Sequence, residues 1–254
     1  MKKYQGYLFD LDGTVYRGTE PIPEAVALLK QLKESDIPYM FVTNNSTKTP
    51  EDVAQTLTAM DIPCTAEDVI TSSMALAGYL QEKHPEAKVY VIGENGLWTA
   101  VREAGFTVTA NKPDYVAVGM DRQLTYEKLA EACLAIRGGA TFLSTNPDVA
   151  LPTERGLLPG NGSITALLQV ATGVTPIFIG KPEPIIIRQA LERLGLAASD
   201  VLMVGDNYQT DILAGLHAGV DTLFVQTGVT TAEELAKVDE PPTYTVASLA
   251  EWRL

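Results

Sequence analysis

The sequence is poor in cysteine and histidine, with two of each among 254 residues. Cys64 and Cys133 form neither a CxxC pair nor a disulfide framework. His84 and His217 have no second histidine or cysteine at a spacing typical of zinc ligands. These absences argue against a structural zinc site, and they favour free thiols in a reducing compartment.

Positive charge and long apolar runs are also scarce. The 19 Lys and Arg residues are outnumbered by 32 Asp and Glu, which gives a formal net charge of −13. No basic cluster that could displace counterions from a polyanion is present, so we expect no nucleic-acid polymer as a partner. No apolar run reaches the length of a membrane span, and the run after Gly6 is broken at Asp10, too early for a signal peptide. We therefore expect a cytoplasmic protein without membrane contact.

Two nucleotide-binding signatures are missing as well. No GxGxxG follows a predicted strand, and no Walker A sequence occurs. The nearest segment is Gly160-Asn161-Gly162-Ser163, which is equally well interpreted as a turn that starts a helix. A dinucleotide-dependent dehydrogenase and a P-loop kinase are both disfavoured.

What the sequence does contain is an alternation of short β-rich runs with helical stretches. Near-continuous apolar runs are typical of strands buried on both faces. They occur at residues 6–12, 38–43, 176–180, 201–205 and 222–226, with helices predicted at 23–34 and 50–60, after residue 180 through about 194, and around 212–216. The alternation predicts an α/β fold with a doubly wound, mainly parallel, Rossmann-like sheet.

The middle of the chain has strands of its own. They are predicted at residues 89–92, 115–118 and 141–144, with helices near 96–104 and 125–137. We therefore expect a smaller α/β unit, residues 80–178, inserted into a core made of residues 1–79 and 179–254.

The first run of chemically active residues is Asp10-Leu-Asp12-Gly13-Thr14, where the first strand ends. Ligands of open α/β sheets bind beyond the carboxyl ends of the strands. Two carboxylates on one side of a strand repel each other unless a cation or a proton accompanies them. One carboxylate can act as nucleophile and metal ligand and the other as acid and base. The alternative is a simple strand-to-turn Asp-Gly.

Three further polar segments follow predicted strands. Thr43-Asn44-Asn45-Ser46 could hold phosphate oxygens, although it is also ordinary loop chemistry. Lys181, after residues 176–180, could neutralise a phosphate and an aspartate together. Asp206, after residues 201–205, could ligate a metal, and Asp211 could orient Lys181 or metal-bound water, although both aspartates could be helix caps. Four such segments are expected to converge on one site.

Together these residues resemble the haloacid dehalogenase superfamily. The resemblance comprises Asp10-Leu-Asp12-Gly13-Thr14, Thr43, Lys181 and Gly205-Asp206 with Asp211, and a long insert at the position of the family's type-two cap. More narrowly, the chain resembles the class IIA, NagD-like or nitrophenylphosphatase-like branch. The supporting segments are Thr43–Ser46, Val91–Gly93, Thr145–Asp148, Gly180–Pro182 and Gly205–Asn207.

The resemblance implies a magnesium-dependent phosphatase acting on small phosphorylated metabolites through an aspartyl-phosphate. Asp10 would be the nucleophile and a Mg²⁺ ligand, and Asp12 the general acid and base, with its backbone carbonyl on the metal. Asp206 would be a further Mg²⁺ ligand. Thr43 and Lys181 would hold the phosphoryl group, with Asn44 and Asn207 nearby. Asp211 would support the site. A cap loop that contains Asn146 and Asp148 would select the substrate.

Several alternatives stay open at this point. A phosphomutase would use the same residues and return the phosphate to its substrate. A regulatory module with an inactive site is disfavoured because Asp10, Asp12, Lys181 and Asp206 are all present. Nucleoside monophosphates, sugar phosphates and phosphoglycolate all remain candidate substrates. A homodimer formed through the cap is one assembly compatible with the sequence.

Overall fold

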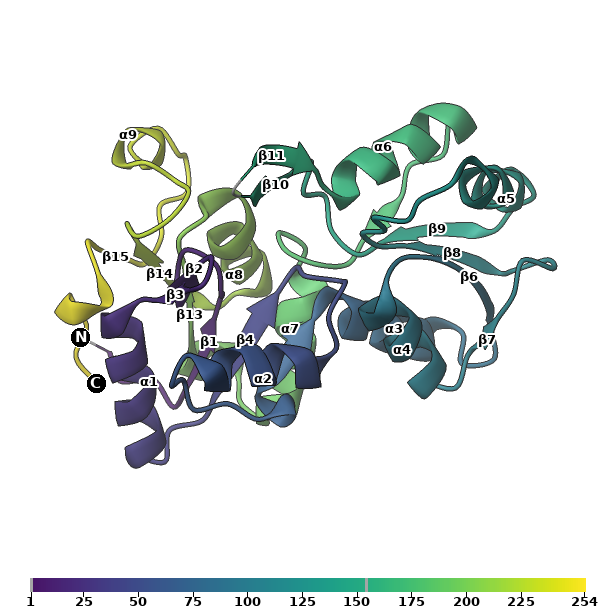
Figure 1. Cartoon of the computed structure of the whole chain (residues 1–254). Helices are drawn as coiled ribbons and strands as arrows, with labels where there is room; N and C mark the ends of the chain where they lie inside the picture. The colour runs from purple at the N-terminus through teal and green to yellow at the C-terminus, as the bar shows by residue number, and fades with distance from the viewer. Residues whose placement is uncertain (1, 154) are drawn as a thin grey trace. The chain divides into compact units, whose positions relative to one another are not determined.

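The computed structural model describes residues 2–153 and 155–254, and these residues divide into two compact units (Figure 1). The first unit comprises Met1–Thr43, Glu51–Ile70 and Lys181–Leu254. The second comprises Asn44–Pro50 and Thr71–Gly180. The chain therefore passes from one unit to the other four times.

A six-stranded sheet forms the centre of the first unit, in the order β15-β14-β13-β1-β4-β5. Strand β1 pairs in parallel with β13 and β4, and β14 pairs in parallel with β13 and β15. The strands span Gly6–Phe9 (β1), Tyr39–Thr43 (β4), Val69–Thr71 (β5), Val201–Gly205 (β13), Asp221–Val225 (β14) and Tyr244–Val246 (β15). The predicted doubly wound, mainly parallel sheet is confirmed.

Alternation along these strands builds a core on each face of the sheet. Tyr7 and Phe9 of β1 join the large apolar cluster that includes Phe41 and Leu29, whereas Leu8 is buried outside that cluster. Because successive side chains point to opposite faces, a fully buried apolar strand needs cover on both. The near-continuous apolar runs of the sequence are explained in this way.

The helices of the first unit supply that cover. Helix α1 buries Leu28, Leu29 and Leu32 in the cluster that contains Phe9, and α2 adds Leu57. Helix α7 contacts β4 and α8, and α8 also contacts β14. The bounds are Pro23–Glu34 (α1), Pro50–Ala59 (α2), Pro184–Leu194 (α7), Leu213–Ala218 (α8) and Ala232–Leu235 (α9), with a hairpin at Tyr16–Arg17 (β2) and Glu20–Pro21 (β3) and a π-helical turn at Tyr208–Ile212.

The second unit has a five-stranded sheet of its own, in the order β12-β9-β8-β6-β7, with every pairing parallel. Its strands span Lys88–Ile92 (β6), Thr107–Val108 (β7), Tyr115–Val118 (β8), Thr141–Ser144 (β9) and Ile177–Phe178 (β12). After β6 the chain adds β7 on one side and β8 on the other, so a topological switch point lies between β6 and β8.

Helices cover this second sheet too. Helix α5 contributes Ala132 and Ile136, and α6 contributes Ile164 and Leu168, to a cluster with Phe142. Helix α3 contacts α4. The bounds are Ser72–Lys83 (α3), Asn95–Glu103 (α4), Tyr126–Arg137 (α5) and Asn161–Thr172 (α6), and a hairpin pairs Ala150–Thr153 (β10) with Gly156–Pro159 (β11).

The observed units differ at their edges from residues 1–79, 179–254 and 80–178. The long segment of the second unit begins at Thr71 because helix α3 contacts helix α4. The second unit also includes the short segment Asn44–Pro50. Strand β12, which precedes Lys181, pairs with β9 and so lies in the second sheet. Within the described residues, the structure has no helix of the length and apolar character that a membrane span requires.

Candidate functional site

Three adjacent strands of the first sheet end in predicted site residues. Asp10 follows β1, Thr43 ends β4 and Asp206 follows β13, and β1 lies between the other two strands. The Asp10 backbone N–H donates to the Val204 carbonyl at 2.9 Å, which continues the pairing with β13 past the end of β1. The strand order therefore places these residues at the carboxyl ends of three neighbouring strands, as the sequence predicts.

Lys181 is buried as deeply as Asp211, with 2% of each side chain exposed. Its ammonium donates to Asp10 Oδ1 at 2.5 Å, to Asp211 Oδ1 at 2.8 Å and to the Val42 carbonyl at 2.9 Å. Three acceptors match the three N–H groups of a lysine. Lys181 thus fixes one oxygen of Asp10 and ties β4 to the turn after β13.

Asp206 is held by the turn that follows Asp10. Thr14 Oγ1 donates to Asp206 Oδ1 at 2.9 Å, and the Val229 N–H donates to Oδ2 at 2.7 Å. Gly13 has φ of +88°, and a Cβ there would lie 2.5 Å from Asp206 Oδ2. A Cβ at Gly228 would lie 1.9 Å from the same oxygen. Both glycines are needed because the carboxylate occupies the space that a side chain would fill.

Asp211 lies one turn further along. Its Oδ2 accepts from the Asn207 N–H at 3.0 Å, and its Oδ1 accepts from Thr210 Oγ1 at 3.0 Å as well as from Lys181. Asn207 uses its own side-chain oxygen to accept from the Gln209 N–H at 3.0 Å, which caps the π-helical turn. Both Asp211 oxygens therefore bind groups of the protein.

The charges of these residues shift one another's pKa values. Burial raises the pKa of Asp10 well above its usual range, and the charge of Asp211 raises it further, against the opposing effect of Lys181. Burial, with the charge of Asp211, also raises the pKa of Asp206 to about 6. Burial alone would lower the pKa of Lys181, but Asp10 and Asp211 outweigh it and raise that pKa. The site favours additional positive charge.

The carboxylates of Asp10, Asp206 and Asp211 form a group that could hold a metal ion, because ligand oxygens of all three lie within 4.8 Å of one another. Three carboxylates and the one ammonium of Lys181 leave a formal charge of −2. A divalent cation would balance that charge, and oxygen donors suit Mg²⁺. The donor set therefore fits a hard divalent cation.

Asp12 stands apart from that cluster, with an exposed side chain. Its backbone forms a bridge with Tyr16, and the Gly13 N–H donates to the Tyr16 carbonyl at 2.7 Å. This tight turn holds Asp12 two residues beyond Asp10 with its carboxylate on the solvent side. An exposed carboxylate is suited to exchanging protons with water.

The remaining predicted residues, Asn44, Asn146 and Asp148, belong to the second unit. Asn146 Nδ2 donates to the Asn44 carbonyl at 2.8 Å, and Asn44 Nδ2 donates to Asp148 Oδ2 at 3.1 Å. Asn146 is 4% exposed. The structure brings these three together, and their proposed roles toward a substrate stay predictions.

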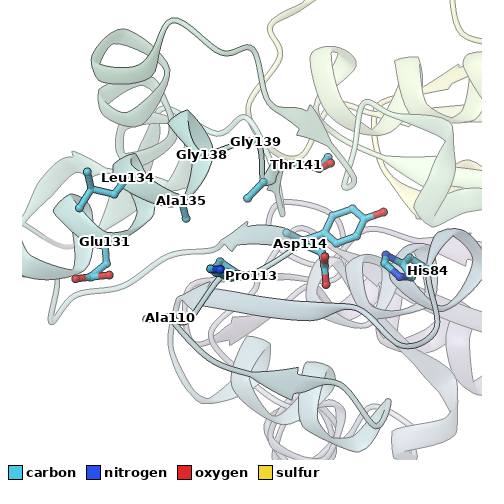
Figure 2. Close-up of a pocket in the computed structure, with 13 residues that line it drawn as sticks. His84, Ala110, Pro113, Asp114, Glu131, Leu134, Ala135, Gly138, Gly139 and Thr141 are labelled. Carbon is cyan, nitrogen blue, oxygen red and sulfur yellow. The ribbon is translucent and has the colours of Figure 1, made fainter.

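A hollow of about 650 Å³ lies elsewhere in the second unit. Figure 2 shows its lining, with His84 and Asp114 on one side and Glu131 and Leu134 on the other. Asp114 precedes β8 and Thr141 starts β9, so the hollow lies at the amino ends of these strands. Ligands of parallel sheets bind at the carboxyl ends. No predicted site residue lines it.

Sequence reasoning missed two supports of Asp206. The sequence pattern assigns no separate role to Thr14, and no recognised motif marks the loop at Gly228-Val229. The signal that could have indicated the Gly228-Val229 loop is a glycine shortly after a predicted strand. The strand predicted at 222–226 ends at Gln226, and Gly228 follows two residues later.

Comparisons with known proteins find related sequences along nearly the whole chain. Haloacid dehalogenase-like hydrolase models match residues 7–107 and 178–252. The 5'-nucleotidase YutF of Bacillus subtilis is 56% identical over 99% of this chain and 98% of its own. An acid sugar phosphatase of Staphylococcus haemolyticus is 55% identical over 98% of this chain and 95% of its own.

A solved structure extends the comparison to the whole fold. NagD from E. coli K-12 has a TM-score of 0.93 and 31% identity, covering 99% of both chains. The predicted resemblance to NagD-like phosphatases is confirmed by these relatives. The chain belongs to the haloacid dehalogenase-like hydrolase family.

Proposed function

We propose that this protein is a magnesium-dependent phosphatase that hydrolyses small phosphate monoesters through an aspartyl-phosphate at Asp10. One observation carries the proposal. Lys181 is buried, and it binds both Asp10 and Asp211 beside a third carboxylate, Asp206. A purely structural site would gain little from three crowded carboxylates, because their repulsion and desolvation oppose folding.

In the first step, an Asp10 oxygen attacks phosphorus as the bond from phosphorus to the leaving oxygen breaks. Asp12 donates its proton to that oxygen, and the alcohol departs. Thr43 holds a phosphoryl oxygen, and Lys181 attracts the phosphoryl group as a nearby positive charge while its N–H groups stay bound to Asp10, Asp211 and Val42. Lysine supplies a compact positive charge that suits both the phosphoryl group and the nucleophile. Positioning and charge neutralisation are the main demands of phosphoryl transfer.

In the second step, Asp12 takes a proton from water as the water oxygen attacks phosphorus. The bond between phosphorus and the Asp10 oxygen breaks, which releases inorganic phosphate and restores the Asp10 carboxylate. Asp12 ends protonated, ready for the next turnover. Its exposed side chain is consistent with both exchanges.

Asp10, Asp206 and the Asp12 backbone carbonyl would hold magnesium, with Asn207 nearby. Bound Mg²⁺ would neutralise phosphate charge as it builds up. Asp211 stays with Lys181, Thr210 and the Asn207 N–H, so its bonds keep the ammonium in place.

Small phosphorylated metabolites are the proposed substrates. The relatives named 5'-nucleotidase and acid sugar phosphatase support nucleoside monophosphates and sugar phosphates as the first compounds to test. Phosphoglycolate belongs in the same panel because it too is a small monoester. Asn146 and Asp148 are the residues of the second unit that are predicted to contribute to substrate choice.

The test is release of inorganic phosphate from such a panel, with 4-nitrophenyl phosphate as a chromogenic member, in magnesium and after chelation. We expect activity with magnesium, loss on chelation, and loss of at least about a thousandfold in Asp10→Asn because an amide is a very poor nucleophile. Asp36→Asn is the matched control, since Asp36 is exposed and its φ of 53° suits asparagine.

Three results would overturn the proposal. They are full activity after exhaustive chelation, substantial turnover by pure Asp10→Asn protein, and an equal loss in Asp36→Asn. An isomeric phosphate ester formed without inorganic phosphate would instead identify a phosphomutase.

A further inference from the structure

Two of the four crossings between the units coincide with residues that the proposed function assigns to the phosphoryl group. Thr43 is the last residue of the first unit before Asn44, and Lys181 is the first residue of the first unit after Gly180. Each phosphoryl-binding residue is therefore bonded through the backbone to a residue of the second unit, Thr43 to Asn44 and Lys181 to Gly180.

The Asn44 side of this arrangement is strongly anchored. Its carbonyl accepts from Asn146 Nδ2 at 2.8 Å and from Ser72 Oγ at 2.7 Å. Its side-chain amide donates to Asp148 Oδ2 at 3.1 Å. Both the backbone and the side chain of Asn44 are thus fixed by three residues of the second unit.

The residues after Asn44 are held as firmly. The Gly96 N–H, at the start of α4, donates to the Thr47 carbonyl at 2.9 Å, and the Met120 N–H, after β8, donates to Ser46 Oγ at 3.0 Å. A Cβ at Gly96 would lie 2.4 Å from the Lys48 carbonyl oxygen. This segment therefore occupies the switch point between β6 and β8, where open parallel sheets bind ligands.

The Gly180 side is anchored by the neighbour of Asn146. The Gly180 N–H donates to the Thr145 carbonyl at 2.9 Å. A Cβ at Gly180 would lie 2.5 Å from both the Thr145 carbonyl oxygen and Asn44 Oδ1. Asn44 and Gly180 are therefore packed against each other, and Thr145-Asn146 bonds to both.

The buried residue Asn161 holds the Thr145-Asn146 segment in place. Asn161, 2% exposed, donates from Nδ2 to the Asn146 carbonyl at 2.7 Å and to Ser144 Oγ at 2.9 Å. Among the described residues, its Oδ1 is the buried side-chain atom left without a hydrogen-bond partner. A buried unpaired oxygen is costly, so the orientation of Asn161 is set by the two bonds from Nδ2.

We propose that Thr145-Asn146 is a clamp on the two crossings, and that Asn146 is a positioning residue for phosphoryl binding by Thr43 and Lys181. The inference rests on the proposed function for the roles of Thr43 and Lys181. It replaces direct contact between Asn146 and the variable part of the substrate with an effect on the phosphoryl group, which every substrate shares.

The two roles predict different kinetics. A residue that touches the leaving group changes the ranking of substrates. A residue that positions the phosphoryl-binding residues changes all substrates by the same factor, and it also changes the affinity for inorganic phosphate, which has no leaving group.

The experiment uses full-length Asn146→Ala and Asn146→Asp. The first removes the donor to Asn44, and the second places an oxygen against the Asn44 carbonyl oxygen. Inorganic phosphate binding is measured by calorimetry with magnesium, and kcat and KM are measured for an alkyl phosphate and for 4-nitrophenyl phosphate. We expect phosphate affinity and kcat/KM for both substrates to fall by a common factor of about ten, as loss of one buried hydrogen bond implies.

Asn161→Ala should act in the same direction with a smaller factor, because it removes only the support behind Asn146. Thr125→Ala is the stability control. Thr125 Oγ1 caps α5 by accepting from the Lys128 N–H at 3.2 Å, so its loss destabilises the second unit without touching Asn44. We expect its phosphate affinity to match the wild type at a temperature where both are folded.

Unchanged phosphate affinity in folded Asn146→Ala and Asn146→Asp, with an active wild type, would overturn the clamp. A changed substrate ranking with unchanged phosphate affinity would assign Asn146 to substrate contact instead. If Thr125→Ala weakens phosphate affinity as much as the Asn146 variants do, the loss of affinity reflects lower stability of the second unit and the clamp is refuted. A wild type that hydrolyses no phosphate ester would refute the proposed function itself, and is recognised before any variant is compared.

Discussion

Replacement of Asp211 by asparagine tests the hydrogen bonds that orient Lys181. The carboxylate accepts from Lys181 and Thr210 on Oδ1 and from the Asn207 N–H on Oδ2. An amide has one acceptor oxygen and one donor group. If its oxygen faces Lys181, its NH₂ faces the Asn207 N–H. If it is flipped, its NH₂ faces the ammonium. Either orientation leaves a buried donor without an acceptor.

The magnitude follows from at least one unmet donor. A buried unsatisfied group costs about 1–3 kcal/mol. The loss is partly offset, because the Asp211 charge raises the pKa of both Asp10 and Asp206 and its removal relieves that repulsion. We therefore expect Asp211→Asn to unfold at a temperature about 2–8 °C lower. Because residues that orient a metal or nucleophile from behind typically contribute 10–100-fold, kcat/KM should fall by about that factor.

The assays are thermal unfolding with and without magnesium and phosphate release at saturating and limiting substrate. Thr210→Val removes only the neutral hydroxyl donor to Asp211, so its effect should be clearly smaller. Asp36→Asn makes the same chemical change at an exposed turn, and it should leave both readouts unchanged. Wild-type stability and activity in Asp211→Asn would refute the argument from hydrogen bonds, as would a larger effect in Thr210→Val.

Two further predictions concern protons. Asp12→Asn should lower kcat/KM by about 10²–10⁴-fold for alkyl phosphates and far less for 4-nitrophenyl phosphate, whose leaving group needs little protonation; equal losses would exclude Asp12 as the acid. Because the folded-state pKa of Asp206 is raised to about 6, the metal-free protein should lose stability as pH rises from about 4 to 6. Magnesium should then raise the unfolding temperature more at pH 7.5 than at pH 5, and equal shifts would contradict this.

The sequence predicts the strands of the first sheet well because burial on both faces leaves a clear apolar run. Strand β13 and helix α1 have the predicted bounds, and Asp10, Thr43 and Asp206 do follow or end adjacent strands. The sequence pattern pairs the carboxylates of Asp10 and Asp12, but in the structure Asp12 is exposed and the carboxylates that lie near Asp10 are those of Asp206 and Asp211.

Other features depend on contacts that no local pattern records. An apolar run of five residues indicates a strand before Lys181 but does not name its partner, and β12 pairs with β9. Helix α3 buries small residues, among them Ser72, Ser73 and Ala75, so its periodicity is weak in the sequence. The attachment of Asn44–Pro50 to the second unit arises from hydrogen bonds to residues distant in the chain, such as Gly96.

The segment at the switch point also limits how this chain can be recombined with its relatives. A graft of residues 71–180 alone would place α4 and β8 of a relative against the native Ser46–Lys48 segment. The carbonyl oxygens of Ser46 and Lys48 lie so close to Gly96 that a Cβ there would clash with them. The exchangeable module is therefore discontinuous in sequence. It consists of residues 44–50 and 71–180 transferred together, although the shorter piece directly follows Thr43 in the sequence, where it could be taken for part of the first unit.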